Sequence, residues 1–252
     1  MDLSNTITLS IVSHGHCILV ENLIHQIDSI PSFEGVSVVV TLNLYDEVFS
    51  YDYKKTSRLK LIIIRNMTQL GYGANHNQAF KKCLTPWFAI LNPDLSLHND
   101  IFSQLIETAS HSHVSLIVPR VVNYRGDQED SIRWNLTPWS LIKRRLRITG
   151  ESCLDDGKFR WFAGMFFIVN SADFLEISGF DEGIFLYGED YDLCARMHLA
   201  GMTLLFQPDI CVVHDARRTS RSSLKFLLMH VKSLLYIWLN SKVWRIAFKD
   251  LF

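Results

Sequence analysis

Hydrophobic and polar positions alternate along this chain in blocks that indicate buried strands separated by helices. Near-continuous apolar runs, typical of strands covered on both faces, occupy residues 7–13, 36–42, 59–64 and 87–91. Between the first two runs, Leu19, Leu23 and Ile27 repeat at the spacing of one helix face. This β-α-β-β opening predicts an α/β fold with a mainly parallel central sheet flanked by helices.

The remaining periodicity extends the same architecture toward residue 214. Further strands are predicted at residues 114–118, 160–169, 203–206 and 210–213. Further helices are predicted at residues 71–83, 100–110, 171–177 and 189–200. Residues 123–158 show poor periodicity, and we interpret them as either a variable loop region or a lid.

Charge separates the last part of the chain from the rest. The formal net charge is −1, yet residues 215–252 hold 8 Lys or Arg against 2 Asp or Glu, which leaves −7 on residues 1–214. We therefore divide the chain into a domain of residues 1–214 and a basic, amphipathic helical tail of residues 215–252. The apolar stripe of this tail suits either a membrane interface or packing against the body.

Cysteine usage and apolar run lengths bear on the compartment. The five cysteines lie scattered without a C-x-x-C pair, which argues for reduced thiols and against a disulfide framework or a zinc site. We see no signal-peptide pattern, and the longest apolar stretch, residues 226–239, is too short to span a bilayer. We expect a cytoplasmic protein without a nucleic-acid partner, in which the tail is the candidate for contact with the inner face of the cytoplasmic membrane.

Polar residues follow the first three predicted strands. Ser13, His14 and Gly15 come after the first strand, and Asn43 and Asn66 come after the next two. Because open α/β sheets bind ligands outside the carboxyl ends of their strands, these residues are candidates for ligand contact.

Two later segments also carry candidate chemistry. Gly71 and Gly73 open a helix, where the backbone can approach an anion closely, although a plain turn explains them equally well. Asn92-Pro93-Asp94 follows a buried strand, and a carboxylate there suits a hard cation. An ordinary Asn-Pro-Asp turn is the alternative for this second segment.

Aromatic and histidine residues near the later strands allow two interpretations each. Trp161 and Gly164 form either a platform for a sugar ring or part of the core. His214 ends a predicted strand before a basic loop, and it is either a ligand or a structural histidine.

The most distinctive stretch is the acidic one that starts the helix at residue 189. Glu189, Asp190 and Asp192 lie within the first helical turn, where backbone N–H groups and the helix dipole favour negative charge. This placement predicts an ionised carboxylate, ready to accept a proton. Simple capping of a surface helix is the alternative.

Taken together, ordered blocks along the chain resemble glycosyltransferase family 2, and within it the rhamnosyltransferase-like members of bacterial surface-polysaccharide assembly. The resemblance covers residues 9–214 and rests on residues 10–13, 71–77, 91–94, 161–164, 179–182, 185–196 and 213–214. It implies a GT-A-type single domain and an inverting, metal-dependent transferase.

The resemblance assigns roles residue by residue. Asp190 matches the general base and Glu189 its acidic neighbour, whereas Asp94 and His214 match ligands of Mg²⁺ or Mn²⁺. The donor and nucleotide contacts that it implies, together with the strand-end residues, are Ser13, His14, Gly15, Asn43, Gly71, Gly73, Asn77, Asn92 and Asp94. Trp161 and Gly164 are the implied acceptor contacts. The chain departs from the family in the loop after residue 13 and at Thr41-Leu42-Asn43.

The implied reaction moves a sugar from a dTDP- or UDP-linked donor, with rhamnose as the first candidate, to a saccharide or polyprenyl-linked saccharide acceptor. It would serve the assembly of O-antigen or capsule. A non-catalytic protein of the same fold that binds nucleotide sugars is one alternative. A nucleotidyltransferase is another, but the basic glycine-rich loop expected after the first strand of such enzymes is missing.

Overall fold

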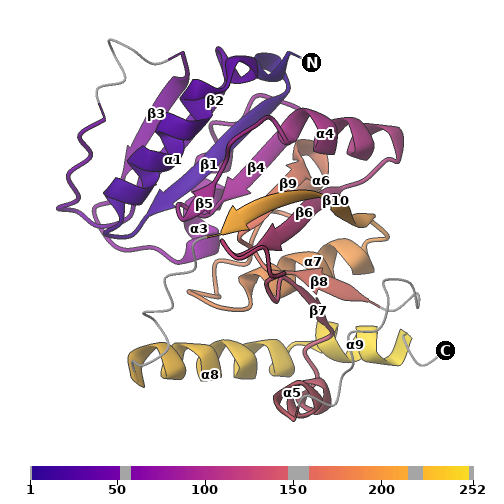
Figure 1. Cartoon of the computed structure of the whole chain (residues 1–252). Helices are drawn as coiled ribbons and strands as arrows, with labels where there is room; N and C mark the ends of the chain where they lie inside the picture. Colours follow the sequence, from indigo (N-terminus) through magenta and orange to yellow (C-terminus); the bar gives the residue numbers. More distant parts are fainter. Residues whose placement is uncertain (1, 52–57, 147–158, 215–223, 250–252) are drawn as a thin grey trace.

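A computed structural model of the chain describes residues 2–51, 58–146, 159–214 and 224–249 (Figure 1). Its centre is an eight-stranded sheet in the order β3-β2-β1-β4-β9-β6-β10-β5, and a separate two-stranded sheet pairs β7 with β8. The strands are β1 (Ile7–Ser13), β2 (Ser37–Leu42), β3 (Lys60–Arg65), β4 (Trp87–Leu91), β5 (Leu95–Ser96), β6 (Leu116–Val122), β7 (Ile132–Trp134), β8 (Arg160–Phe162), β9 (Phe166–Asn170) and β10 (Leu204–His214).

The predicted mainly parallel sheet is confirmed. β1 pairs in parallel with β2 and β4, β2 with β3, and β6 with β10. Two strands depart from this direction: β9 runs antiparallel to β4 and β6, and the short β5 runs antiparallel to β10.

Two predicted boundaries are wrong. The single strand expected at residues 160–169 is two strands in different sheets, because the chain turns at Ala163–Met165. The two short strands expected at 203–206 and 210–213 are one strand, β10, with an irregularity between Gln207 and Cys211. Residues 123–158, expected to lack regular structure, contain β7 and the helix α5 (Pro138–Arg145).

Alternation along the strands builds two hydrophobic cores, one on each face of the sheet. Val38 and Val40 of β2 belong to one cluster and Val39 to the other, as the period of two in a strand requires. The first cluster is covered by α1 (Cys17–Ser29), α4 (Phe102–His111) and the short helices η1 (Leu3–Asn5) and η2 (Pro31–Phe33). The second is covered by α3 (Tyr72–Phe80), α6 (Ser171–Glu176) and α7 (Glu189–Leu199).

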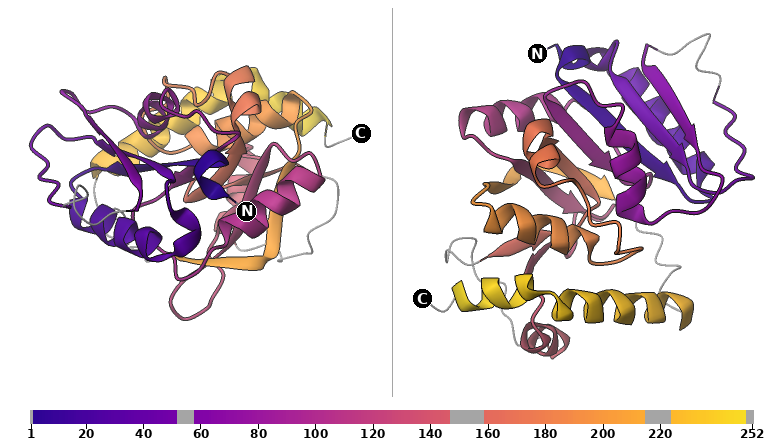
Figure 2. Two further views of the ribbon diagram at one scale, coloured as in Figure 1. Left: turned by 90° about the horizontal axis from the view of Figure 1, so that it is seen from above. Right: turned by 180° about the vertical axis from the view of Figure 1, so that it is seen from behind.

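The tail adds a further layer beyond α7. Helices α8 (Leu224–Leu239) and α9 (Ser241–Lys249) lie at the end of the molecule away from the large sheet, next to α5 (Figures 1 and 2). Ile237, Val243 and Ile246 are buried in the same cluster as Leu193 and Met197 of α7. The inner side of the tail therefore packs against the body, which was one of the two interpretations of its apolar stripe. The side chains of Lys143–Arg145 lie outside the described residues.

Candidate active site

The carboxyl ends of the parallel strands bring the sequence-predicted residues to one edge of the sheet. Because β6 and β10 are both parallel to β4 through the antiparallel β9, the end of β10 meets the ends of β1, β2 and β4 there. Ser13, Asn43, Asp94 and His214 lie at or just beyond these ends.

Asn43 organises the part of this edge at the end of β2. Its amide oxygen accepts hydrogen bonds from the Asn66 side chain and the Leu70 N–H, both at 2.9 Å. Its amide nitrogen donates to the Leu70 carbonyl at 2.9 Å and lies 3.2 Å from His14 Nδ1. An amide side chain offers two donors and two acceptor lone pairs, so a direct contact with a nucleotide would have to replace one of these bonds.

The loop after β1 is held by Glu47, a residue that the sequence did not single out. Glu47 is 8% exposed, and it accepts hydrogen bonds from the Ser13 hydroxyl and, at 2.9 Å, from the Leu44 N–H. Burial opposes ionisation of Glu47, but these hydrogen bonds outweigh it and lower its pKa. Gly15 follows in the left-handed region, with φ of 77°. Glu47 lies in a loop without periodicity, so no sequence signal marked it.

Gly71 and Gly73 allow two parts of the chain to pack closely. A Cβ on Gly71 would lie 2.7 Å from the Phe185 carbonyl oxygen, and one on Gly73 would lie 2.5 Å from Phe180 Cβ. The side chain of Asn77 donates to the Phe180 carbonyl at 2.9 Å and accepts from its N–H at 2.8 Å. These three residues, predicted as donor contacts, hold the segment that leads into the acidic helix.

Asp190 is fixed at the start of α7 by two backbone donors. The N–H of Gly164 donates to Oδ2 at 3.1 Å, and the N–H of Tyr191 donates to Oδ1 at 2.8 Å. Burial raises the pKa of Asp190, and the positive charge of Arg133 opposes that rise. Gly164, predicted as an acceptor contact, is therefore brought directly to the predicted base.

Glu189 differs from its neighbour in both exposure and hydrogen bonding. It is 6% exposed, and its Oε2 atom has no hydrogen-bond partner among the described residues. Burial, together with the nearby charge of Asp190, raises the pKa of Glu189 to about 8. The expectation that the helix start keeps its carboxylates ionised is thus wrong for Glu189, because desolvation exceeds the effect of the dipole.

The turn before this pair is unusual in its backbone conformation. Tyr187 has φ of 69° and Gly188 has φ of 93°. A left-handed conformation costs a residue with a Cβ free energy, and such outliers gather where the surrounding structure imposes them. A Cβ on Gly188 would also lie 2.5 Å from Ile237 Cδ1 of the tail, so no larger residue fits there without rearrangement.

Tyr72 joins the acidic helix to the Asn92-Pro93-Asp94 segment. Its hydroxyl lies 2.6 Å from the Gly164 carbonyl oxygen and 3.2 Å from Asn92 Oδ1. Burial raises the pKa of Tyr72 well above its usual range, with contributions from the charges of Glu189, Asp190 and Asp94. One hydroxyl group therefore lies near all three carboxylates.

Asp94 and His214 form the second centre of the site. His214 Nε2 lies 3.2 Å from Asp94 Oδ1, and His214 Nδ1 lies 2.9 Å from Glu129 Oε2. The carboxylate of Glu129 accepts a hydrogen bond, so Nδ1 carries the hydrogen and Nε2 faces Asp94. Burial disfavours the charged form of His214, but Asp94 and Glu129 outweigh it and raise the pKa of the imidazole. Glu129 falls in the segment interpreted as a loop or lid and was missed.

The arrangement of these two side chains fits a divalent cation. Asp94 Oδ1 and His214 Nε2 are buried and face each other at 3.2 Å, and neither has another hydrogen-bond partner among the described residues. When His214 is neutral, the lone pair on Nε2 faces the negatively charged Oδ1 of Asp94. The two atoms then repel each other unless a proton or a metal ion lies between them. Two ligand atoms that each lie about 2.1 Å from a metal ion, with a right angle between the two bonds, are about 3 Å apart. This separation is close to the 3.2 Å between Asp94 Oδ1 and His214 Nε2. The described residues supply no cluster of three such ligands, so other positions would fall to water or phosphate oxygens, as is usual for Mg²⁺.

Trp161 does not agree with the prediction of a sugar platform. The ring is 3% exposed, and its Nε1 donates to the Trp134 carbonyl at 2.7 Å. Tyr191 packs edge-on at 5.7 Å, and the guanidinium of Arg133 lies 5.0 Å from the ring centroid. Trp161 therefore belongs to the core, and it supports Arg133 beside Asp190.

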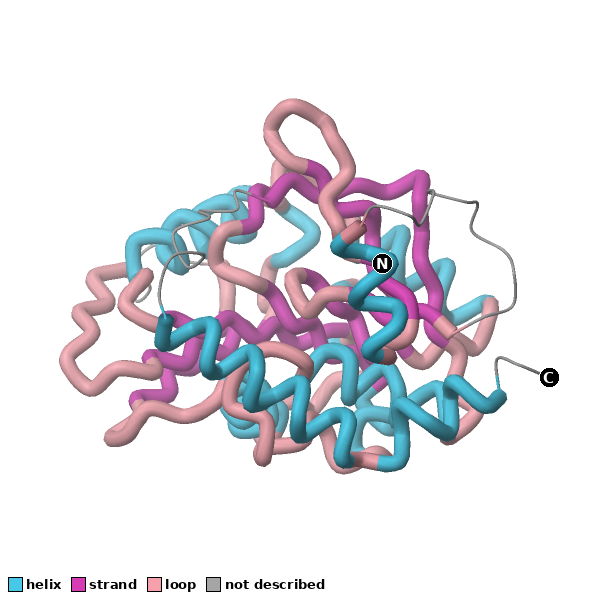
Figure 3. The backbone as a smooth tube through the Cα atoms, turned by 90° about the horizontal axis from the view of Figure 1, so that it is seen from below, coloured by secondary structure: helices cyan, strands magenta, loops and turns pink. Residues whose placement is uncertain are grey.

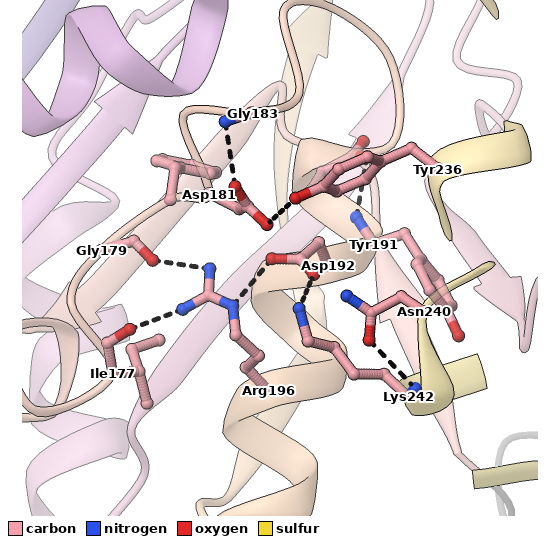
Figure 4. A network of polar contacts seen from close by, with 12 residues as sticks. Ile177, Gly179, Asp181, Gly183, Tyr191, Asp192, Arg196, Tyr236, Asn240 and Lys242 are labelled. Atoms are coloured by element: carbon pink, nitrogen blue, oxygen red, sulfur yellow. Dashed lines mark hydrogen bonds and ion pairs between the residues drawn. The ribbon is translucent and has the colours of Figure 1, made fainter. Parts of the chain in front are cut away.

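Asp192 has a structural role that the sequence left open. It is 3% exposed and lies between two cations, with Arg196 Nε at 2.7 Å and Lys242 Nζ at 2.5 Å (Figure 4). Arg196 also donates to the carbonyls of Ile177 and Gly179, both at 2.6 Å. The third carboxylate of the motif thus ties α7 to the tail and to the loop before the acidic helix.

Comparison with known proteins identifies the family of this chain. The family model of glycosyl transferase family 2 matches residues 47–174. The chain is 27% identical over 239 residues to rhamnosyltransferase WbbL of Escherichia coli K12, covering 88% of this chain and 89% of that protein. It is 27% identical over 203 residues to N-acetylglucosaminyl-diphospho-decaprenol L-rhamnosyltransferase of Mycobacterium tuberculosis, covering 72% of this chain and 64% of that protein.

A solved structure shows the same fold at lower identity. The crystal structure of GalNAc-T7 with UDP, GalNAc and Mn²⁺ superposes with a TM-score of 0.62 at 18% identity, over 83% of this chain and 43% of that one. The likeness supports the GT-A fold that the resemblance implied. Because the family model matches more than half of this chain, the chain belongs to glycosyltransferase family 2.

Proposed function

We propose that this protein transfers a sugar, with rhamnose as the first candidate, from a nucleoside diphosphate to a saccharide or lipid-linked saccharide, with inversion. The relatives named as rhamnosyltransferases support the donor sugar, and the one named for a diphospho-decaprenol acceptor supports a lipid carrier. On this basis we place the reaction in the assembly of a bacterial cell-surface polysaccharide.

The observation that carries the proposal is the link through Tyr72 between Asp190 and the Asn92-Pro93-Asp94 segment. The Tyr72 hydroxyl contacts the Gly164 carbonyl at 2.6 Å, and the N–H of Gly164 donates to Asp190 at 3.1 Å. The Tyr72 hydroxyl also reaches Asn92, two residues before Asp94. This link supports a base for the acceptor and a centre for the leaving diphosphate on one connected set of residues, as a single displacement requires.

In this mechanism Asp190 takes the proton of the attacking acceptor hydroxyl. The two backbone donors orient its carboxylate, and its raised pKa makes it a stronger base than an exposed aspartate. The pKa of Glu189, raised to about 8, favours its neutral form near pH 7, so the role of base falls to Asp190.

At the second centre, Asp94 and His214 would hold Mg²⁺ or Mn²⁺, while Glu129 orients the imidazole of His214. The cation, when bound, supplies positive charge for the departing diphosphate. We propose that the donor nucleotide lies along the edge formed by Ser13, His14 and Asn43.

The test measures release of nucleoside diphosphate from dTDP- and UDP-sugars, with and without a polyprenyl-diphosphate-linked saccharide. We expect release that depends on the acceptor, and a product whose anomeric configuration is opposite to that of the donor. A thermal-shift screen of the same donors with and without Mn²⁺ identifies the nucleotide, because a ligand bound only by the native state raises stability. Donor binding without transfer to any saccharide acceptor would favour the non-catalytic alternative.

A further inference from the structure

Helix α8 is apolar on two opposite sides, and only one of them faces the body. Its inner side holds the segment before the acidic helix: Ile237 packs against Gly188, and the Ser233 hydroxyl donates to the Leu186 carbonyl at 2.9 Å. Its outer side carries apolar residues that recur every four positions, with Leu227 59%, Val231 44%, Leu235 51% and Leu239 89% exposed. A helix that is apolar all round is ordinarily covered on all sides.

Two neighbouring helices also expose apolar side chains. Trp244 and Phe248 of α9 are 41% and 65% exposed, and Trp139 and Ile142 of α5 are 64% and 48% exposed. We call this surface the outer face. Its apolar members are Trp139, Ile142, Leu146, Leu227, Leu228, Val231, Leu235, Leu239, Trp244 and Phe248.

Hydrogen bonds hold the three helices together. The Trp238 indole donates to the Leu136 carbonyl at 2.8 Å, and the Asn135 side chain donates to the Val243 carbonyl at 3.0 Å. These bonds fix the start of α5 against the junction of α8 and α9. Figure 3 views the molecule from this end, where the two tail helices run across toward the C-terminus.

The charge on these helices has a single sign. The sequences of α5, α8 and α9 contain no Asp or Glu, and each contains Lys or Arg. Lys242 is engaged by Asp192 on the inner side, but Lys232, Arg245 and Lys249 are exposed. Exposed leucines and tryptophans, together with basic residues and no acidic ones, match the interface of an anionic bilayer.

Resting on the proposed lipid-linked acceptor, we propose that the outer face docks on the surface of an anionic phospholipid bilayer. The helices then lie in the plane of the interface, because none in the described part of the chain has the length and apolar character needed to cross it. The inner side of α8 would hold the catalytic segment next to the membrane from which the acceptor projects.

The test is sedimentation of the full-length protein with vesicles, in the absence of donor and acceptor. We expect binding to phosphatidylcholine vesicles that contain phosphatidylglycerol, weaker binding to pure phosphatidylcholine, and a loss of binding as salt rises. The double variant L228E/L235E should bind about tenfold or more weakly. The matched control is L84E/L175E, because Leu84 and Leu175 are exposed at 96% and 68% on other surfaces.

A second variant reports on the charges and on α9 separately. R245Q/K249Q should lose the preference for phosphatidylglycerol while the fold, checked by circular dichroism, is unchanged.

L228E/L235E should still transfer sugar to a water-soluble acceptor. Loss of vesicle binding with transfer retained therefore reports on docking, whereas loss of transfer in the parent reports on the proposed function. The proposal is overturned if wild-type protein ignores anionic vesicles at low salt, or if L228E/L235E binds as tightly as L84E/L175E. A lipid-free dimer that L228E/L235E converts to monomer would also overturn it, since the outer face would then bind a second copy.

Discussion

Lys242 of α9 reaches across to Asp192 of α7, with 2.5 Å between Nζ and Oδ1, in a site where Asp192 is only 3% exposed. The same carboxylate also binds Arg196 at 2.7 Å, so one anion joins the acidic helix, the tail and the preceding loop. Asp192 therefore has a structural role, unlike its neighbour Asp190.

We expect Asp192→Asn to destabilise the protein strongly, because it leaves two cations without their buried counter-charge. Removing one partner of a buried ion pair costs about 3–5 kcal/mol in the free energy of unfolding. Lys242→Met should cost less, because Arg196 still neutralises Asp192. Urea unfolding of both variants and of the double variant measures the coupling. Additive effects would show that the two residues do not interact as the structure indicates.

Asp190→Asn should abolish most of the turnover while the fold and donor affinity persist. The amide keeps the size of the side chain but cannot take a proton, and a positioned base contributes about 10²–10⁴-fold in rate. Single-turnover rates and donor titrations separate the two effects. The matched control is Asp173→Asn, since Asp173 also lies in the first turn of a helix. Turnover of Asp190→Asn at the parental rate would exclude Asp190 as the base.

Glu189→Gln should retain transfer near pH 7, because the amide mimics the neutral carboxyl that a pKa of about 8 implies. A carboxyl whose pKa rises from 4.5 in the unfolded chain to about 8 in the folded one contributes less stability as pH rises through that window. Between pH 4.5 and 8 the melting temperature of the parent should therefore decline relative to that of Glu189→Gln. Identical pH profiles of melting temperature would contradict the raised pKa.

Arg133→Gln should move the acidic limb of the rate profile to higher pH. Arg133 opposes the rise that burial produces in the pKa of Asp190, so its removal raises that pKa further. A base works when deprotonated, and the variant therefore needs a higher pH for the same rate. The dependence of kcat/KM on pH measures the shift. Arg125→Gln, in an exposed turn, is the control, and an unshifted limb in Arg133→Gln would show that this charge does not act on the base.

Glu129→Gln should weaken Mn²⁺ binding by about 10–100-fold without removing a direct ligand. The amide is a poorer acceptor for the Nδ1 hydrogen of His214, so the imidazole is less well oriented toward Asp94. Calorimetric titration of Mn²⁺ into the enzyme with nucleoside diphosphate measures the change, with Asp94→Asn as the variant that removes a ligand. Full transfer activity in excess chelator would contradict a cation at Asp94 and His214.

Local pattern determined much of this protein. Apolar runs placed β1, β2, β3 and β4 to within a residue, since a buried strand needs only its own side chains to be apolar. The rule that ligands lie at the carboxyl ends of such strands then brought Asp94 and His214 to one edge, and the structure places them 3.2 Å apart. Ordered motifs were enough to indicate the family.

Tertiary packing decided the rest, because partners far apart in sequence have no local signal. The sequence around Gly73 does not indicate that Phe180 packs against it. The sequence around Trp161 likewise does not indicate that Arg133 and Tyr191 pack against its ring. Periodicity joined residues 160–169 into one strand, whereas the turn that presents Gly164 to Asp190 depends on α7 packing beside it. The raised pKa of Glu189 likewise follows from burial, which only the folded chain creates.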